Sequence, residues 1–552
     1  MKKFFGQLLL AVAAVALFAS CDNPAKMAEA AEKININCTP EVLEVVAGNI
    51  DATVDVTFPG EYFHPKAILE VTPVILYHGG EVAGEPFYYQ GEKVKDNYKV
   101  IAKKEITTVR EKVNFAYIPG MERSELVLRA KVIYKSQEYE YPADIKVADG
   151  ANTTYMLAKS ILAQGGGVAS YLSDEYQAII PETTEAQILY LINSADVRNS
   201  ELKNSGIKDY QKALENLAAD SRRTIKGTEI VAYASPEGEI AHNNKLSANR
   251  EKSAAKALGT ITKKLETGEV TSRSIGEDWE GFQDLVSNSN IEDKELILRV
   301  LSMYSDPNVR EREIKNMSQI YTSLAKEVLP ELRRARFITN VEYANYTDAE
   351  LRELLANNVD GLDEEALLYT ATLVDGTDTK LSIYDQAIKK FNSERAKYNA
   401  ALTAFKDGRM AKAQEYINKL NDQNLKDVKN LKGLLALAGD DSATAAKLFT
   451  ESGVTENLAV VDILNGNYQG ALSKLQGKSG ENAALANILN GNLAGAENAL
   501  KNATGDVASY LKAIVAARKG DANTVRNLLE KISDKALKER AADDIEFLKL
   551  LQ

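Results

Sequence analysis

A glycine recurs at nearly regular intervals through the last third of the chain, and this repeat restricts the fold more than any other feature. From about residue 363 onward the composition shifts to Ala, Leu, Lys, Asn and Gly, without the alternating pattern of a strand. The recurring glycines lie 25 to 31 residues apart, at Gly408, Gly439, Gly466, Gly491 and Gly520. Glycine is the usual residue where a helix ends in the left-handed conformation. Because a helical hairpin can bury its apolar face only against a neighbouring hairpin, residues 360–552 are predicted to form an α-solenoid.

The residues after these glycines support helical hairpins. Five positions after most of them stands a small or β-branched side chain, at Ala413, Ala471, Ala496 and Val525. Such residues let the two helices of a hairpin approach closely. Residues 399–416 resemble the tetratricopeptide repeat best, although the glycine spacing is shorter than the roughly 34 residues of that repeat. The resemblance implies an extended surface that binds peptides and proteins, and the apolar residues Phe547, Leu548, Leu550 and Leu551 are expected to cap the array.

A second constraining stretch lies near the middle of the chain. Residues 228–232 are apolar enough for a short buried strand, Pro236 and Gly238 mark a turn, and a helical pattern begins at Asn243. Arg250 then stands one to two turns into this helix. Free backbone N–H groups and the helix dipole favour an anion at such a place, and the guanidinium fork fits a carboxylate.

This stretch resembles the motif of the peptidoglycan-associating OmpA-like domain. The residues at the spacing of that motif are Gly238, Asn243, Leu246, Ser247 and Arg250. Residues 188–195 and 333–343 resemble the opening and closing strands of the family. The resemblance implies an α/β OmpA-like domain over residues 183–347.

The same resemblance implies a ligand site, with one change from the family. In the family, an Asp and an Arg hold the diaminopimelate of the cell-wall peptide. Here the Arg position is Arg250, and the Asp position is Ser235. The candidate peptidoglycan-binding residues are therefore Ser235, Asn243 and Arg250, without the carboxylate that pairs with the ammonium of the ligand.

The OmpA-like region also carries an insertion. Apolar residues recur at helical spacing over residues 292–332, and Asp306 and Pro307 break this pattern. Before it, Glu277 and Asp278 directly precede the single Trp of the chain, Trp279. Acidic residues favour helix N-termini, so we interpret this pair as a helix start and not as the acid pair of a sugar site.

The N-terminus has the pattern of a secretory signal peptide. Lys2 and Lys3 precede an apolar run over residues 8–18, and small residues lead to Cys21. Residues 1–20 resemble a lipoprotein signal, which implies acylation of Cys21 and attachment to a membrane; an ordinary signal peptide with a coincidental Cys is the alternative. Residues 21–36 are interpreted as a tether. If Cys21 carries lipid, Cys38 has no disulfide partner and is expected to be a buried or tolerated thiol.

Two regions connect the tether to the OmpA-like region. Residues 37–150 contain β-branched segments and an alternating run over residues 126–135, which predict a β-sandwich of some seven strands. Residues 151–182 are interpreted as a linker. Within them, residues 164–168 read Gln-Gly-Gly-Gly-Val, lack the ending of a phosphate-binding loop, and are expected to form a hinge or loop.

The chain as a whole is therefore expected to be multidomain and non-catalytic. Its net charge of −12 argues against a nucleic-acid partner and against a polybasic membrane surface. We find no Ser/Cys–His–Asp set and no cluster of metal ligands in the sequence, so no enzyme activity, cofactor or metal is expected. The leading hypothesis is an outer-membrane lipoprotein with periplasmic domains, a scaffold that binds envelope proteins through its repeats. The alternative is a tether between the outer membrane and peptidoglycan.

Overall fold

The computed structural model describes residues 24–551, so the predicted signal peptide and Cys21 lie outside the described residues. The chain forms two compact units. The sandwich–solenoid unit contains the chain up to Ser173 and again from Val374, and the four-stranded unit contains Asp174–Leu373. Within residues 24–551 no helix has the length and hydrophobicity needed to span a membrane.

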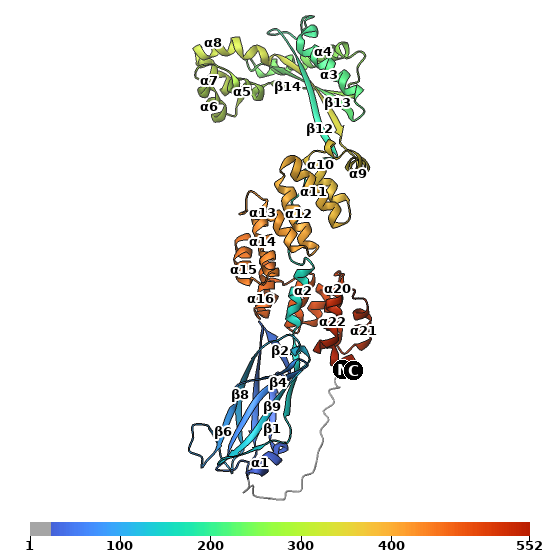
Figure 1. The fold of residues 1–552 in the computed structure, drawn as a ribbon. Helices are drawn as coiled ribbons and strands as arrows, with labels where there is room; N and C mark the ends of the chain where they lie inside the picture. The colour runs from blue at the N-terminus through green and yellow to red at the C-terminus, as the bar shows by residue number, and fades with distance from the viewer. Residues whose placement is uncertain (1–23, 552) are drawn as a thin grey trace, which may run out of the picture. The chain divides into compact units, whose positions relative to one another are not determined.

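The N-terminal strands form one curled sheet of eleven strands (Figure 1). They are β1 Asn35–Thr39, β2 Val42–Val46, β3 Asn49–Phe58, β4 Ile68–Tyr77, β5 Gly80–Ala83, β6 Phe87–Gly91, β7 Lys99–Ile101, β8 Thr107–Ala116, β9 Ser124–Tyr134, β10 Gln137–Glu140 and β11 Ile145–Asn152, with a 3₁₀ turn, η2, at Met121–Arg123. The sequence analysis predicted two sheets and fewer strands. The two layers are instead continuous, because β2 and β11 pair in parallel and join them.

Part of the predicted tether is folded onto this sheet. Residues 24–33 contain helix α1, Ala25–Glu29, and a 3₁₀ turn, η1, at Ala31–Lys33. Met27 is fully buried, and the Tyr62 hydroxyl donates to its carbonyl oxygen at 2.8 Å. Because Met27 and Ala28 are buried, this segment packs on the sandwich and is not a free linker. Cys38 is buried in β1, as expected, and burial raises the pKa of its thiol to about 11.

The helical hairpins predicted for the C-terminal region are confirmed. The helices are α11 Thr377–Phe391, α12 Glu394–Lys406, α13 Met410–Asn418, α14 Lys426–Ala438, α15 Ser442–Ser452, α16 Thr455–Leu464, α17 Tyr468–Lys474, α18 Glu481–Leu489, α19 Leu493–Ala499, α20 Asp506–Arg518, α21 Ala522–Glu530, α22 Lys535–Asp543 and α23 Ile545–Leu551. Five hairpins, from α12–α13 to α20–α21, turn at the predicted positions. The last helix does not simply cap the array, because α23 also packs against strand β11.

The turns differ from the prediction at one position. Gly408, Gly466, Gly491 and Gly520 adopt the left-handed conformation, with φ between 73° and 80°. In the second hairpin Gly439 has a φ of −90°, and Asp440 takes the left-handed position with a φ of 64°. Five residues after Asp440 lies Ala445, which is fully buried like Ala413, Ala471, Ala496 and Val525. In all five hairpins, therefore, a small or β-branched residue lies five positions after the residue with the left-handed conformation.

The first half of the predicted linker belongs to the core of the sandwich–solenoid unit. It contains a 3₁₀ turn, η3, at Thr154–Met156 and helix α2, Leu157–Ala163. This helix packs against α14, α16, α18 and α20, and its side chains at Leu157, Ala158, Ile161 and Leu162 are buried. An apolar helix of this kind must bury its surface against other elements, and it packs on the first helices of the repeats.

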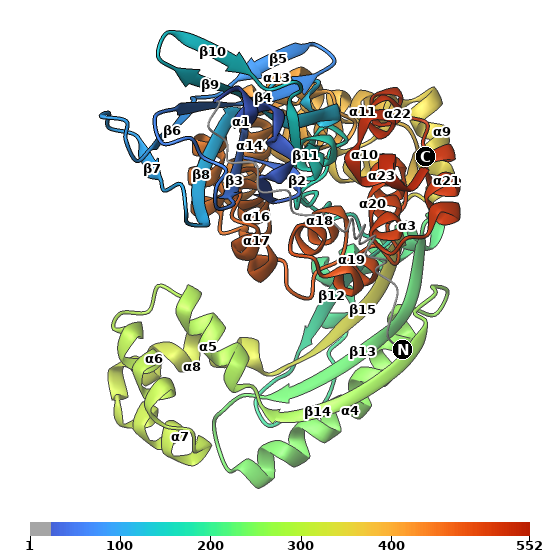
Figure 2. The same cartoon turned by 90° about the horizontal axis from the view of Figure 1, so that it is seen from below.

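The four-stranded unit has a mixed sheet with the order β12-β15-β13-β14, twisted as Figure 2 shows. Its elements are β12 Ile179–Leu189, η4 Glu201–Lys203, α3 Ser205–Ala219, β13 Arg223–Ala234, α4 Ile240–Ile261, β14 Glu269–Glu277, α5 Trp279–Asn288, α6 Lys294–Met303, α7 Pro307–Asn316, α8 Ser318–Glu327, η5 Leu329–Leu332, β15 Arg334–Ala344, α9 Asp348–Asn357, η6 Val359–Gly361 and α10 Glu364–Leu373. Helices α3 and α4 pack on the sheet, around a core that includes Ile230, Phe337 and Leu258. Only β13 and β14 pair in parallel.

Two sequence predictions in this unit differ from the structure in their bounds. The opening strand begins earlier and ends at Leu189, so residues 190–195 form the loop that follows β12. The insertion contains four helices, α5 to α8, with their own core around Phe282, Ile297 and Leu324. Its break at Asp306 is confirmed, because the Asp306 side chain accepts a hydrogen bond from Asn308 N and caps α7.

Candidate functional site

Arg250, the central residue of the predicted ligand site, lies inside the four-stranded unit. Its side chain projects from α4 and is only 1% exposed. The guanidinium donates to three carbonyl oxygens, those of Tyr233 at 2.9 Å, Ser194 at 3.0 Å and Leu191 at 3.2 Å. Arg250 therefore ties the loop after β12 to the end of β13.

The surroundings of Arg250 are those of a buried structural cation. Its guanidinium carbon lies 5.0 Å from the centre of the Tyr190 ring. Desolvation by burial lowers the pKa of Arg250 to about 10, although the electrostatic interaction with Tyr190 acts to raise this pKa. A charged group with this degree of burial needs hydrogen-bond partners, and each of its three nitrogens donates to a carbonyl oxygen of the chain here.

Ser235 lies next to a carboxylate that the sequence analysis did not single out. Its hydroxyl donates to Glu237 Oε1 at 2.7 Å, and Ser235 is buried. Two nitrogens of Arg333 donate to the same Glu237 oxygen, at 2.9 Å and 2.7 Å. The negative charge missing from position 235 is thus supplied from two residues downstream.

Asn243, the third predicted ligand residue, is held by an acidic side chain. Its amide donates to Glu277 Oε1 at 2.9 Å, and the Trp279 indole donates to the other oxygen of Glu277 at 2.9 Å. Asp278 accepts from Gly281 N at 2.9 Å and pairs with Arg334 at 2.7 Å, so it caps α5 as expected. Both acidic residues beside Trp279 therefore have structural partners. The peptidoglycan-binding role of Ser235, Asn243 and Arg250 stays a prediction.

A different polar set lies in the sandwich–solenoid unit, where the repeats hold the irregular segment of the chain that follows α2. We call residues 164–173 the bound segment. Asn399 on α12 accepts from Leu172 N at 2.8 Å and donates to Leu172 O at 2.9 Å. In the same way, Asn457 on α16 accepts from Val168 N at 2.8 Å and donates to Val168 O at 2.9 Å. Asn430 on α14 donates to Val168 O at 2.7 Å and accepts from Asn457 at 2.7 Å.

These three amides form what we call the asparagine face, the sides of α12, α14 and α16 that carry Asn399, Asn430 and Asn457. All three residues are buried. The sequence contains a signal for them, because each lies nine positions before one of the recurring glycines, Gly408, Gly439 and Gly466. Asn482 holds the same position before Gly491, and its side-chain oxygen is buried with no hydrogen-bond partner among the described residues.

The three consecutive glycines predicted to form a hinge or loop lie in the bound segment, close to the repeats. A Cβ at Gly165 would overlap the backbone of Lys406, and one at Gly167 would overlap the Leu434 side chain. Both residues also have positive φ values, 74° and 124°. Glycine is therefore required here for a close backbone approach, which anchors the segment at the repeats.

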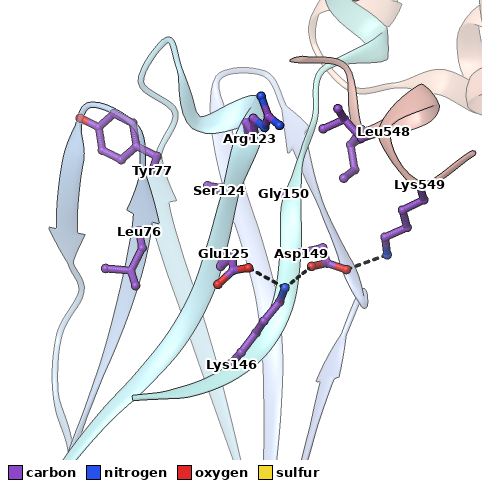
Figure 3. A pocket seen from close by; sticks show the side chains of 11 residues that line it. Leu76, Tyr77, Arg123, Ser124, Glu125, Lys146, Asp149, Gly150, Leu548 and Lys549 are labelled. Atoms are coloured by element: carbon purple, nitrogen blue, oxygen red, sulfur yellow. Dashed lines mark hydrogen bonds and ion pairs between the residues drawn. The ribbon is translucent and has the colours of Figure 1, made fainter. Parts of the chain in front are cut away.

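The largest of the described pockets lies where the sandwich meets the last helix. It has a volume of about 730 Å³ and is lined by residues of β4, β9, β11 and α23. Figure 3 shows Lys146 between Glu125 and Asp149, with ion-pair distances of 2.7 Å to each, and Lys549 paired with Asp149 at 2.6 Å. The Lys549–Asp149 pair fastens α23 to the sheet. Within residues 24–551, we find no group of three or more His, Cys, Asp or Glu side chains that could hold a metal ion.

Comparisons with known proteins add little to this picture. No protein-family model matches the chain, and no curated protein matches it. Among solved structures, it is similar to the crystal structure of the yeast Tom70, with 14% sequence identity and a TM-score of 0.24. That alignment covers 62% of this chain and 78% of the yeast chain. The description of the C-terminal region as stacked helical hairpins rests on its own helices and their contacts.

Proposed function

We propose that this protein is a non-catalytic scaffold of the cell envelope that binds protein partners through its helical repeats. The observation that carries the proposal is the asparagine face, which holds an extended polypeptide by its backbone. Stacked helical hairpins present long surfaces suited to peptides and proteins. The acidic net charge of −12 is compatible with protein partners and unfavourable for nucleic acid.

The proposal includes attachment to the outer membrane through lipid on Cys21. It is supported by the charged, apolar and small-residue regions that precede this Cys in the sequence. Growth with a labelled fatty acid tests it. Label should enter the wild-type chain and not the Cys21→Ser variant, and the variant should leave the membrane fraction. Equal labelling of both chains would exclude this anchor.

The partner-binding role is tested by photo-crosslinking in cells. A photoreactive amino acid is placed at exposed positions on the repeats, Lys447 on α15 and Arg526 on α21, and at the exposed Lys212 on α3 as a control. We expect discrete protein adducts from the repeat positions and none of these adducts from position 212. Identical patterns from all three positions, or none, would contradict the proposal.

A second candidate function is a tether to peptidoglycan, and it would use the four-stranded unit. It is supported by the order of the elements, in which the closing strand β15 lies between the opening strand β12 and the motif strand β13, and α4 follows the motif. It is also supported by Glu237, which brings a carboxylate to Ser235. These features favour a rebuilt OmpA-like site.

Co-sedimentation with purified peptidoglycan separates the two functions. Arg250 is so deeply buried that its replacement would also destabilise the fold. The test therefore removes the carboxylate at position 237 or moves it to position 235. If Glu237 replaces the Asp of the family, Glu237→Gln should abolish binding, and the double variant Ser235→Asp, Glu237→Ser should restore it. Absence of binding in all three chains would leave the scaffold function alone.

A further inference from the structure

The repeats hold the bound segment by its main chain and leave most of its side chains exposed to solvent. Val168 is 47% exposed and Tyr171 is 41% exposed, although the backbone groups of Val168 and Leu172 bond to buried amides. Backbone recognition of this kind depends little on the side chains of the bound peptide. Another extended peptide could make the same hydrogen bonds.

The geometry matches a strand-like ligand. Asn399 and Asn457 each offer one acceptor and one donor to a single residue, as a neighbouring β-strand would. The two recognised residues, Val168 and Leu172, are four positions apart, which in an extended chain is about 13 Å. One helical hairpin, α14–α15, lies between the hairpins that carry the two asparagines, and the residues from Val168 to Leu172 reach from one asparagine to the other.

The contacts also define which peptide would fit. Glycine is needed at the positions of Gly165 and Gly167, where a Cβ would overlap α12 or the Leu434 side chain. Four residues after the second glycine, the Lys406 ammonium lies 4.9 Å from the centre of the Tyr171 ring. An aromatic side chain at this place gains a cation–π contact. The fitting ligand is a segment in which a glycine-containing turn precedes the residues that bond to the asparagines, with an aromatic residue four positions after the last glycine.

We propose that the asparagine face is a peptide-binding site for such segments, and that residues 164–173 occupy it as a self-ligand that a partner's segment must displace. This inference rests on the proposed scaffold function and adds its regulation. A tethered ligand acts at an effective concentration of the order of millimolar, so the intact chain binds a free peptide only weakly. Weakening the self-ligand opens the site.

The test is direct binding of a fluorescent synthetic peptide with the sequence of residues 164–173, followed by anisotropy. The full-length wild-type chain is compared with Gly165→Ala, in which the new Cβ overlaps the Lys406 backbone and loosens the self-ligand. Gly259→Ala is the matched control, since a Cβ there meets nothing within 4 Å. We expect Gly165→Ala to bind the peptide at least tenfold more tightly than the wild type and the control.

The asparagines supply the second arm of the test. Adding Asn399→Ala and Asn457→Ala to Gly165→Ala should remove the gain in affinity. If circular dichroism shows that Gly165→Ala does not fold, Gly167→Ala replaces it, because there the overlap is with the end of the flexible Leu434 side chain. A folded glycine variant that does not bind the peptide, or that binds it equally without the asparagines, overturns the proposal. Crosslinks from Lys447 and Arg526 that persist in that case would leave the scaffold function intact.

Discussion

Two regions of this molecule use buried polar side chains to hold backbone groups of the same chain, and they do so with different consequences. In the four-stranded unit, one charged side chain, Arg250, binds carbonyl oxygens on the loop after β12 and at the end of β13. In the sandwich–solenoid unit, neutral amides bind the amides and carbonyls of an extended segment. The first arrangement fixes a loop to a buried charge, and the second holds an irregular segment whose side chains are mostly exposed.

The two arrangements differ in whether the side chain can exchange its backbone partners for other hydrogen-bond partners. A buried guanidinium that loses its carbonyl partners leaves a charge without compensation, so its contacts are effectively permanent. An asparagine amide that loses a peptide can accept water instead at modest cost. Exchangeable ligands are therefore expected at the asparagine face, and structural permanence is expected at Arg250.

The largest effect is predicted for Arg250→Ala. It removes three hydrogen bonds and a fully buried side chain, so we expect a loss of about 3 to 5 kcal/mol in the stability of the four-stranded unit. Urea denaturation followed by hydrogen exchange on α4 measures it. The exposed Arg273, which pairs with Glu229 at 2.5 Å, is the control, and Arg273→Ala should cost below about 1 kcal/mol. Equal losses in the two variants would show that Arg250 is not a core residue.

A smaller effect is predicted for Asn457→Ala. This residue makes hydrogen bonds to both backbone groups of Val168 and to Asn430, and we expect a loss of about 1 to 2 kcal/mol. Asn482→Ala is the matched control at the same position of the next repeat, where the side-chain oxygen has no described partner. Thermal unfolding should place the control close to the wild type. If the two variants lose the same stability, the contacts with the bound segment contribute nothing.

The turn glycines permit a matched comparison within the repeats. Gly408 and Gly491 have almost the same φ, 74° and 73°, so alanine costs about 1 to 2 kcal/mol of backbone strain at either one. A Cβ at Gly408 would also crowd Ala163 O at the end of α2, whereas one at Gly491 meets nothing within 4 Å. We expect Gly408→Ala to be less stable than Gly491→Ala by about 1 kcal/mol in chemical denaturation. No difference between them would mean that α2 does not sit against the first hairpin.

The smallest effect concerns Asp149, which joins the sandwich to α23. Hydrogen bonds from Lys146 and Lys549 lower the pKa of its carboxyl below the ordinary value of 3.8. A lowered pKa in the folded state stabilises the fold above pH 3.8, and this contribution is lost as the pH falls through the folded-state pKa. Asp149→Asn should therefore cost less than about 1 kcal/mol at pH 7 and still less near pH 2. Denaturation midpoints at both pH values measure the difference, and a cost that grows toward low pH would contradict the assignment.

Local signals in the sequence were sufficient for the repeats but not for the segment that they hold. The turn glycines predicted the hairpins because a left-handed helix end depends on one residue. The bound segment could not be recognised in the same way, because three adjacent glycines are typical of a flexible loop, and their role here depends on Lys406 and Leu434, far away in the sequence. The short apolar helix α2 was missed for the same reason, since its partners are four distant helices.

The predicted ligand site shows the same limit. The helix, its turn and the position of Arg250 followed from the spacing of the motif. The burial of the guanidinium depends on where the chain goes after Leu189, and the predicted continuation of β12 through residue 195 placed that chain wrongly. Glu237 could be found only in three dimensions, because its link to Arg333 joins positions 96 residues apart.

Hydrogen exchange at two amides of the bound segment tests the central claim most directly. Val168 N donates to Asn457 and Leu172 N donates to Asn399, and the side chains around them are largely exposed. We predict that both amides exchange at least about tenfold more slowly than in the urea-unfolded chain. Asn457→Ala should release Val168 and keep Leu172 protected, and Asn399→Ala should do the reverse. Two unprotected amides in the wild-type chain, or protection that survives both substitutions, would contradict a segment held by the asparagine face.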